Sequence, residues 1–176
     1  MDNHLPVLPR TTATRLSLVG GAVLALAAGG FILLGWTASA AVTAGGSGIC
    51  LLIGGHRANH DAGDALDRML DELLDRLWDG TILAPIAWAA RGPSPHIAAG
   101  ALVALGASFL SSYVRARGAA LRYTVEESHV TRGVRYALIV AGLAFGWLAW
   151  TVWVAAALMV AAVAVRTSQV AKEQRA

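Results

Sequence analysis

The chain has 176 residues, of which 56% are hydrophobic and only 14% are charged. Soluble domains average about 25% charged residues, so this composition excludes a disordered chain, disfavours an ordinary soluble enzyme and predicts an integral membrane protein. Cys50 is the single cysteine, which excludes an internal disulfide framework and a cysteine-ligated zinc site. In a membrane protein, the net charge of +3 indicates a basic cytoplasmic face beside anionic lipid, so no nucleic-acid partner is expected.

The first half of the chain contains two apolar stretches and one mixed stretch. A spanning helix needs about 20 mostly apolar residues. Residues 16–38 satisfy this without a single charge, and residues 39–55 form a weaker, glycine-rich run. Residues 61–90 begin acidic and become apolar from Thr81. We interpret this third stretch as one helix whose polar, cytoplasmic half continues into the membrane.

The second half contains a short apolar stretch at residues 97–114 and a long one at residues 134–165. The long stretch exceeds the length of one ordinary span and therefore predicts two helices, divided near Gly146. The fold expected is an all-α integral membrane protein with six transmembrane helices. Its divisions would be an N-terminal segment at 1–15, a membrane domain at 16–166 and a C-terminal tail at 167–176.

The distribution of basic residues predicts the orientation. With six spans, only Arg91 lies on one side of the membrane, and thirteen basic residues lie on the other. Cytoplasmic loops carry the excess of Lys and Arg. Both termini are therefore expected in the cytoplasm, in a multi-pass protein of the cell (plasma) membrane. The thirteen are Arg10, Arg15, Arg57, Arg68, Arg76, Arg115, Arg117, Arg122, Arg132, Arg135, Arg166, Lys172 and Arg175.

Seven of the eleven acidic residues lie between Asp61 and Asp79. On a helix, five of them fall within about 120° of one another, with Asp61 at the margin, and leucines and a methionine cover the opposite side. The carboxylate face comprises Asp64, Asp67, Asp71, Asp75 and Asp79, and the apolar face comprises Leu66, Met69, Leu70, Leu73 and Leu77.

Two interpretations of this acidic face remain open. One is a solvated amphipathic surface on which Arg68 and Arg76 form pairs along the helix. The other is a cation site, since Asp75 and Asp79 would lie near the membrane boundary, where ionisable groups are costly and usually functional. Neighbouring carboxylates repel one another unless a cation lies between them, and Mg²⁺ or Mn²⁺ suits their oxygen atoms.

The segment Leu70–Gly80 resembles the second half of the CDP-alcohol phosphatidyltransferase signature, D-x2-D-G-x2-A-R-x8-G-x3-D-x3-D. The segments Ser112–Arg117 (SYVRAR) and Thr131–Arg135 (TRGVR) resemble those that follow in actinobacterial phosphatidylinositol-phosphate synthases. Together with the hydropathy pattern, the resemblance covers roughly residues 15–170.

The resemblance implies an enzyme that transfers a phosphatidyl group from CDP-diacylglycerol to a polar alcohol, inositol phosphate being one candidate, and releases CMP. It implies two divalent metals, Mg²⁺ or Mn²⁺, with Asp71 and Asp75 as metal ligands and Asp75 also as general base. It further implies a pocket for a phosphorylated acceptor, because arginine forks suit phosphate; the alternative for these arginines is anchoring at the interface. The arginines are Arg115, Arg117, Arg132 and Arg135.

The chain departs from the signature in its first half. Cys50 and Ile53 stand where the first two aspartates belong, although Gly54 keeps the following glycine. The residues of the A-R pair do not match at 57–58, and Asp67 replaces the second glycine. Asp61, Asp64 or Asp67 could replace the missing ligands, a question left open. The alternative function is a catalytically impaired relative that acts as a membrane scaffold or as the partner subunit of an intact synthase, in a homodimer or heterodimer.

Overall fold

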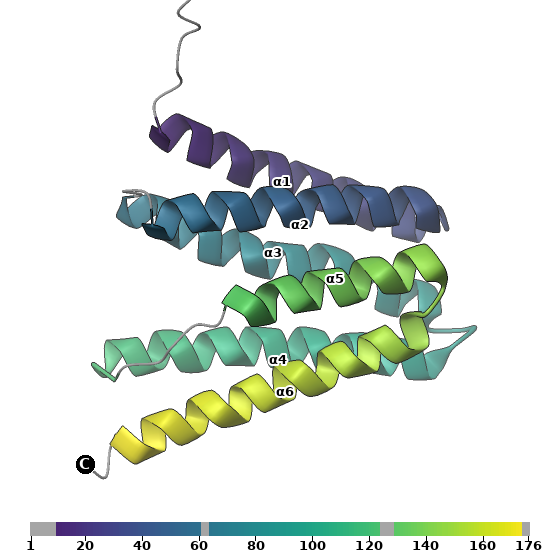
Figure 1. The fold of residues 1–176 in the computed structure, drawn as a ribbon. Coiled ribbons are helices and arrows are strands. Elements are labelled where there is room, and N and C mark those ends of the chain that lie inside the picture. The colour runs from purple at the N-terminus through teal and green to yellow at the C-terminus, as the bar shows by residue number, and fades with distance from the viewer. Residues whose placement is uncertain (1–9, 61–63, 124–128, 174–176) are drawn as a thin grey trace, which may run out of the picture.

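The computed structural model describes residues 10–60, 64–123 and 129–173, and this part of the chain consists of helices joined by short turns, without a strand (Figure 1). Four of the helices are long and apolar enough to cross a membrane, namely α1, α2, α4 and α6. The acidic α3 and the 17-residue α5 do not meet that criterion, so the count of six spans stays a prediction. The helices are α1 (Arg10–Leu33), α2 (Thr37–His60), α3 (Ala65–Ala90), α4 (Pro95–Ala120), α5 (His129–Phe145) and α6 (Leu148–Glu173).

Two glycines in the left-handed region make the sharpest turns. Gly146, with φ +72°, separates α5 from α6, which confirms the predicted division of the last apolar stretch. Gly35, with φ +76°, ends α1 earlier than the expected boundary at residue 38. The Trp36 amide there donates to the Phe31 carbonyl, which caps the helix. The end of the first helix was predicted too late, because residues on both sides of the turn are apolar. The position of the turn depends on the glycine that can adopt positive φ.

The six helices form a closed ring of neighbours in which α3 and α5 are not adjacent, and α2 also contacts α3. Helix α1 packs on α2 and α3, α3 also packs on α4, α4 packs on α6, and α5 lies against α2 and α6. The start of α1 and the end of α6 lie at the same end of the bundle (Figure 1). Within the described residues, no Cα atom of α5 comes within 8 Å of a Cα atom of α3. Long side chains must therefore fill the space between these two helices.

Small residues bring the first three helices close together, as expected for packing in lipid. A Cβ atom on Gly54 of α2 would lie 2.7 Å from the Leu18 Cδ2 atom of α1. A Cβ atom on Gly29 of α1 would overlap the Thr81 carbonyl oxygen of α3. The first approach joins α2 to α1 and the second joins α1 to α3, so that α1 lies close to both helices.

Candidate functional site

The acidic face of α3 points into the bundle. Four of its five aspartates are buried, with exposed fractions of 2% or less: Asp67, Asp71, Asp75 and Asp79. The opposite, apolar face is exposed at Leu66, Met69, Leu73 and Leu77. This confirms the predicted division of the helix into two faces. The interpretation as a solvated acidic surface is wrong for the four buried residues, because their carboxylates face the neighbouring helices and not solvent.

Asp64 and Asp67 are engaged at the start of α3. They form a capping box, in which the Asp64 carboxylate accepts from the Asp67 amide at 2.8 Å and the Asp67 side chain accepts from the Asp64 amide at 3.4 Å. Arg15 of α1 pairs with Asp67 at 2.8 Å and with Asp64 at 2.9 Å. These two aspartates therefore stabilise the helix end and its contact with α1. Asp61 lies outside the described residues.

Asp71 pairs with Arg132 of α5. The Arg132 Nη1 atom lies 2.7 Å from Asp71 Oδ1, and Asn59 of α2 donates to Asp71 Oδ2 at 3.2 Å. A Cβ atom on Gly55 would lie 2.9 Å from the Asp71 Cγ atom and 3.1 Å from Arg132 Nη1. Helix α2 therefore contributes an amide and an open space to this pair.

Asp75 has the largest number of polar neighbours. Its Oδ1 atom lies 2.7 Å from Arg135 Nη2 and accepts a hydrogen bond from the Tyr136 hydroxyl at 2.6 Å. Arg132 Nε lies 3.4 Å from the same oxygen. Arg76, the next residue along α3, pairs with the other oxygen. Both oxygen atoms of Asp75 are therefore occupied by groups of the chain itself.

Asp79 ends the row. Its Oδ1 atom lies 2.9 Å from Arg135 Nε, so that Arg135 bridges two successive aspartates. Its Oδ2 atom lies 3.1 Å from Arg76 Nη1 and accepts a hydrogen bond from the Ser108 hydroxyl of α4. Arg76 also donates to the Ser108 carbonyl at 2.9 Å. Three helices thus meet at this carboxylate.

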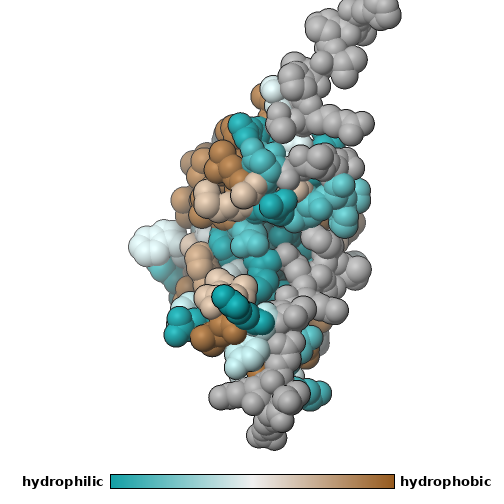
Figure 2. Space-filling model, turned by 90° about the vertical axis from the view of Figure 1, so that its left-hand side faces the viewer, coloured by the Kyte–Doolittle hydropathy of each residue, from teal (hydrophilic) through white to brown (hydrophobic). Residues whose placement is uncertain are grey.

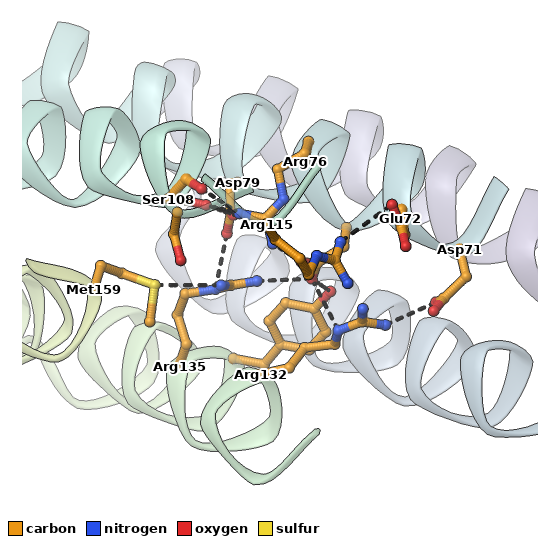
Figure 3. Close-up of polar contacts among 12 residues, drawn as sticks. Asp71, Glu72, Arg76, Asp79, Ser108, Arg115, Arg132, Arg135 and Met159 are labelled. Atoms are coloured by element: carbon orange, nitrogen blue, oxygen red, sulfur yellow. Dashed lines mark hydrogen bonds and ion pairs between the residues drawn. The ribbon is translucent and has the colours of Figure 1, made fainter. Parts of the chain in front are cut away.

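We call Asp71, Asp75, Asp79, Arg76, Arg132 and Arg135 the Asp–Arg cluster (Figure 3). It contains three carboxylates and three guanidinium groups, whose formal charges balance when all six are ionised. The two α5 arginines are 3–4% exposed, and their side chains cross the space between α5 and α3. Arg135 also donates to the Met159 sulfur of α6 at 3.4 Å. Removing one partner from a buried ion pair costs about 3–5 kcal/mol, because it leaves the other charge uncompensated.

The other residues singled out in the sequence lie around this cluster. Arg115 of α4 pairs with Glu72 at 3.2 Å, and Arg117 is exposed on the same helix. Ile53 is 45% exposed, and Cys50 is partly buried with its carbonyl bound by the Ser17 hydroxyl. The structure brings Arg132 and Arg135 to the aspartates, and leaves Arg115 and Arg117 outside the cluster.

The donor set does not fit the two divalent metals that the resemblance implies. A two-metal site holds its ions with carboxylates that have open lone pairs, whereas all three cluster carboxylates bind arginines. Helix α2 brings no carboxylate, since Cys50 and Ile53 stand at the relevant positions. Across residues 10–60, 64–123 and 129–173, no three His, Cys, Asp or Glu side chains converge to hold a metal ion.

Sequence reasoning missed four contributors to the site, namely Arg15, Asn59, Ser108 and Tyr136. Nothing local distinguishes the first three from ordinary polar residues on apolar helices. Tyr136 had a signal, because it follows Arg135 at the start of an apolar stretch, where a polar group requires a buried partner. Its ring also contacts Trp78 of α3, with centroids 4.1 Å apart.

The comparisons with known proteins give matches only among solved structures: no family model and no curated protein sequence matches. The matches include three structures of the phosphatidylinositol phosphate synthase PgsA1 of Mycobacterium tuberculosis. With CDP-DAG bound, PgsA1 aligns at 20% identity over 93% of this chain and 86% of its own, with a TM-score of 0.74. The apo form aligns at 20% identity over 93% and 89% of the two chains, with a TM-score of 0.72.

The third structure is PgsA1 with manganese and citrate. It aligns at 19% identity over 93% of this chain and 82% of its own, with a TM-score of 0.69. At this level of identity the likeness concerns the fold. The chain therefore has the fold of a phosphatidylinositol phosphate synthase, and the predicted resemblance to CDP-alcohol phosphatidyltransferases is confirmed at that level.

Proposed function

We propose that this chain is a membrane protein of phospholipid biosynthesis that retains the phosphatidyltransferase fold without performing the transfer, and that it acts as a partner subunit of an intact synthase. The observation that carries this proposal is the occupation of Asp71, Asp75 and Asp79 by the chain's own arginines. Phosphatidyl transfer requires metal ions to offset the pyrophosphate charge, and the described part of the chain presents no open carboxylate set for that role.

The geometry around Asp75 argues in the same direction. A general base must reach the proton that it removes. Both oxygen atoms of Asp75 instead face Arg76, Arg135 and the Tyr136 hydroxyl. A carboxylate held between two guanidinium groups is a weak proton acceptor, because protonation would leave the positive charges unpaired. These contacts suit a structural counter-ion better than a base.

A second candidate is the transferase itself. It would take CDP-diacylglycerol as donor and a polar alcohol as acceptor, with Mg²⁺ or Mn²⁺ as cofactor. The positions of Asp71 and Asp75 favour it, because both lie buried on the inward face, one turn apart, as the signature requires. In this candidate Asp75 is the base, and Arg132 and Arg135 leave the carboxylates to bind the acceptor phosphate, with Arg115 and Arg117 at the outer rim.

The cluster lies in the half of the bundle that carries most of the basic residues. Figure 2 looks onto that end, where hydrophilic residues gather in the middle and hydrophobic residues flank them. Positive charge marks the cytoplasmic side of membrane proteins. We therefore propose a cell-membrane location with this end in the cytoplasm and residues 16–166 as the membrane domain.

The deciding experiment is a transfer assay with the purified full chain in liposomes. It would supply radiolabelled CDP-diacylglycerol, Mg²⁺ or Mn²⁺, and inositol phosphate or glycerol phosphate, and measure CMP release. We expect no release above that of Asp75→Asn. Release that disappears in both Asp71→Asn and Asp75→Asn would establish the second candidate instead.

The partner role has its own test. An intact phosphatidylinositol phosphate synthase would be reconstituted with and without this chain, and its rate and its chemical cross-linking to the chain would be measured. We expect a cross-linked complex and an altered rate. Absence of both would contradict the partner role while leaving the result of the transfer assay unaffected.

A further inference from the structure

We infer that the α5 arginines have replaced divalent metal as the cations of this fold, so that the Asp–Arg cluster is a metal-free structural centre that joins α3 to α5. The inference concerns the same site as the proposed function, but it makes claims about stability and cation binding. Those claims can fail whether or not the chain transfers a phosphatidyl group.

The first step is the charge balance. Three buried carboxylates face three guanidinium groups, and every carboxylate has a guanidinium nitrogen within 3 Å. Adding two divalent cations to this neutral cluster would place four uncompensated positive charges in the interior. Uncompensated buried charge is strongly unfavourable. A metal could bind only after the arginines had left.

The second step is the geometry of α5. Arg132 and Arg135 are three residues apart, so both point from one face of the helix toward α3 (Figure 3). On α3 the aspartates recur every four residues, which places them along one face opposite the arginines. Because the Cα atoms of the two helices stay more than 8 Å apart, long side chains such as those of Arg132, Arg135 and Tyr136 are needed to reach across.

The third step is that the arginines are held by groups with no role in binding a metal. The absence of a side chain at Gly55 leaves room for the Asp71–Arg132 pair. The Met159 sulfur accepts from Arg135 Nη1, and the Tyr136 hydroxyl shares the Asp75 oxygen with Arg135. These contacts hold the arginines against the carboxylates with groups of the chain alone.

The test begins with the wild-type chain in detergent, unfolded by heat with MnCl₂ alone, with MgCl₂ alone or with EDTA, and followed by tryptophan fluorescence. We expect the same Tm in all three. A ligand at one hundred times its Kd stabilises a protein by about 2.7 kcal/mol, so a resident metal site would give a clear shift. A rise in Tm with MnCl₂ that saturates would overturn the inference.

A double-mutant cycle tests the arginines directly. The variants are Asp71→Asn, Arg132→Gln and their combination, with Arg117→Gln on the exposed face of α4 as the matched control. We expect each of the two single variants, Asp71→Asn and Arg132→Gln, to lower Tm by about 10 °C, because each removes one partner of a buried ion pair. The combination should lose clearly less than the two single losses together. Additive losses would show that the pair contributes no coupling and would overturn the inference.

Should a single variant fail to fold, the reversed pair Asp71→Arg with Arg132→Asp replaces it in the cycle. Folding of the reversed pair supports the ion-pair centre. A fold that is lost in Arg132→Gln but restored by MnCl₂ also supports it, because a cation then takes the place of the arginine. Arg132→Gln with an unchanged Tm would overturn it.

Discussion

The two halves of α3 are buried by different means. The first half places Asp71 and Asp75 in the interior and satisfies them with arginines from elsewhere in the chain. Apart from Asp79 at its start, the second half buries apolar side chains, namely Trp78, Ile82 and Ile86, by packing against its neighbours. An apolar side chain accepts any partner of suitable shape, whereas a buried carboxylate requires a cation at hydrogen-bond distance. The first half therefore depends on the identity of a few residues, and the second half depends on volume.

The largest effect should come from the arginine that bridges two aspartates. Arg135→Ala removes one guanidinium partner from Asp75 and one from Asp79, so that both depend on Arg76, and we expect a loss of about 3–5 kcal/mol in the free energy of unfolding. Thermal unfolding in detergent would measure it. If Arg135→Ala lowers the free energy of unfolding by less than Ile82→Val does, charge pairing does not matter more than apolar packing in α3.

A smaller effect should come from filling the space beside Asp71. The new methyl group of Gly55→Ala would overlap the Asp71 carboxylate and crowd Arg132. Such overpacking typically costs about 1–3 kcal/mol. Gly20→Ala on α1 is the matched control, since a Cβ atom there meets nothing within 4 Å. Equal Tm values for the two variants would show that the close approach at Gly55 does not affect the stability of the protein.

The apolar half should respond mildly to a conservative change. Ile82 is fully buried, and Ile82→Val removes one methylene group without leaving a charge behind. We expect a loss of about 0.5–1.5 kcal/mol, read from the same unfolding curves. A loss as large as that of Arg135→Ala would mean that packing, and not charge pairing, dominates throughout α3.

The smallest effect should come from the ion pair at the rim. Glu72 is half exposed and pairs with Arg115. Water screens such pairs, so Glu72→Gln should change the free energy of unfolding by less than about 1 kcal/mol. Unfolding at low and high salt would measure this, and a loss comparable to that of Arg135→Ala would place Glu72 inside the cluster after all.

Much of the architecture follows from the sequence alone. Apolar runs of spanning length predict helices in lipid, and a glycine that can adopt positive φ predicts the turn at Gly146. The spacing of Asp67, Asp71, Asp75 and Asp79 predicts one carboxylate face. These features depend on local geometry, in which neighbours along the chain determine the result.

The tertiary structure alone decided what the carboxylate face binds. Asp71 and Arg132 are 61 residues apart, and Asp67 and Arg15 are 52 apart. The same aspartates, read along the chain, are compatible with a metal site and with a solvated surface. Only the packing of α5 opposite α3 brings the arginines to the acidic face, because an ion pair depends on a distance of a few ångströms that no local pattern records.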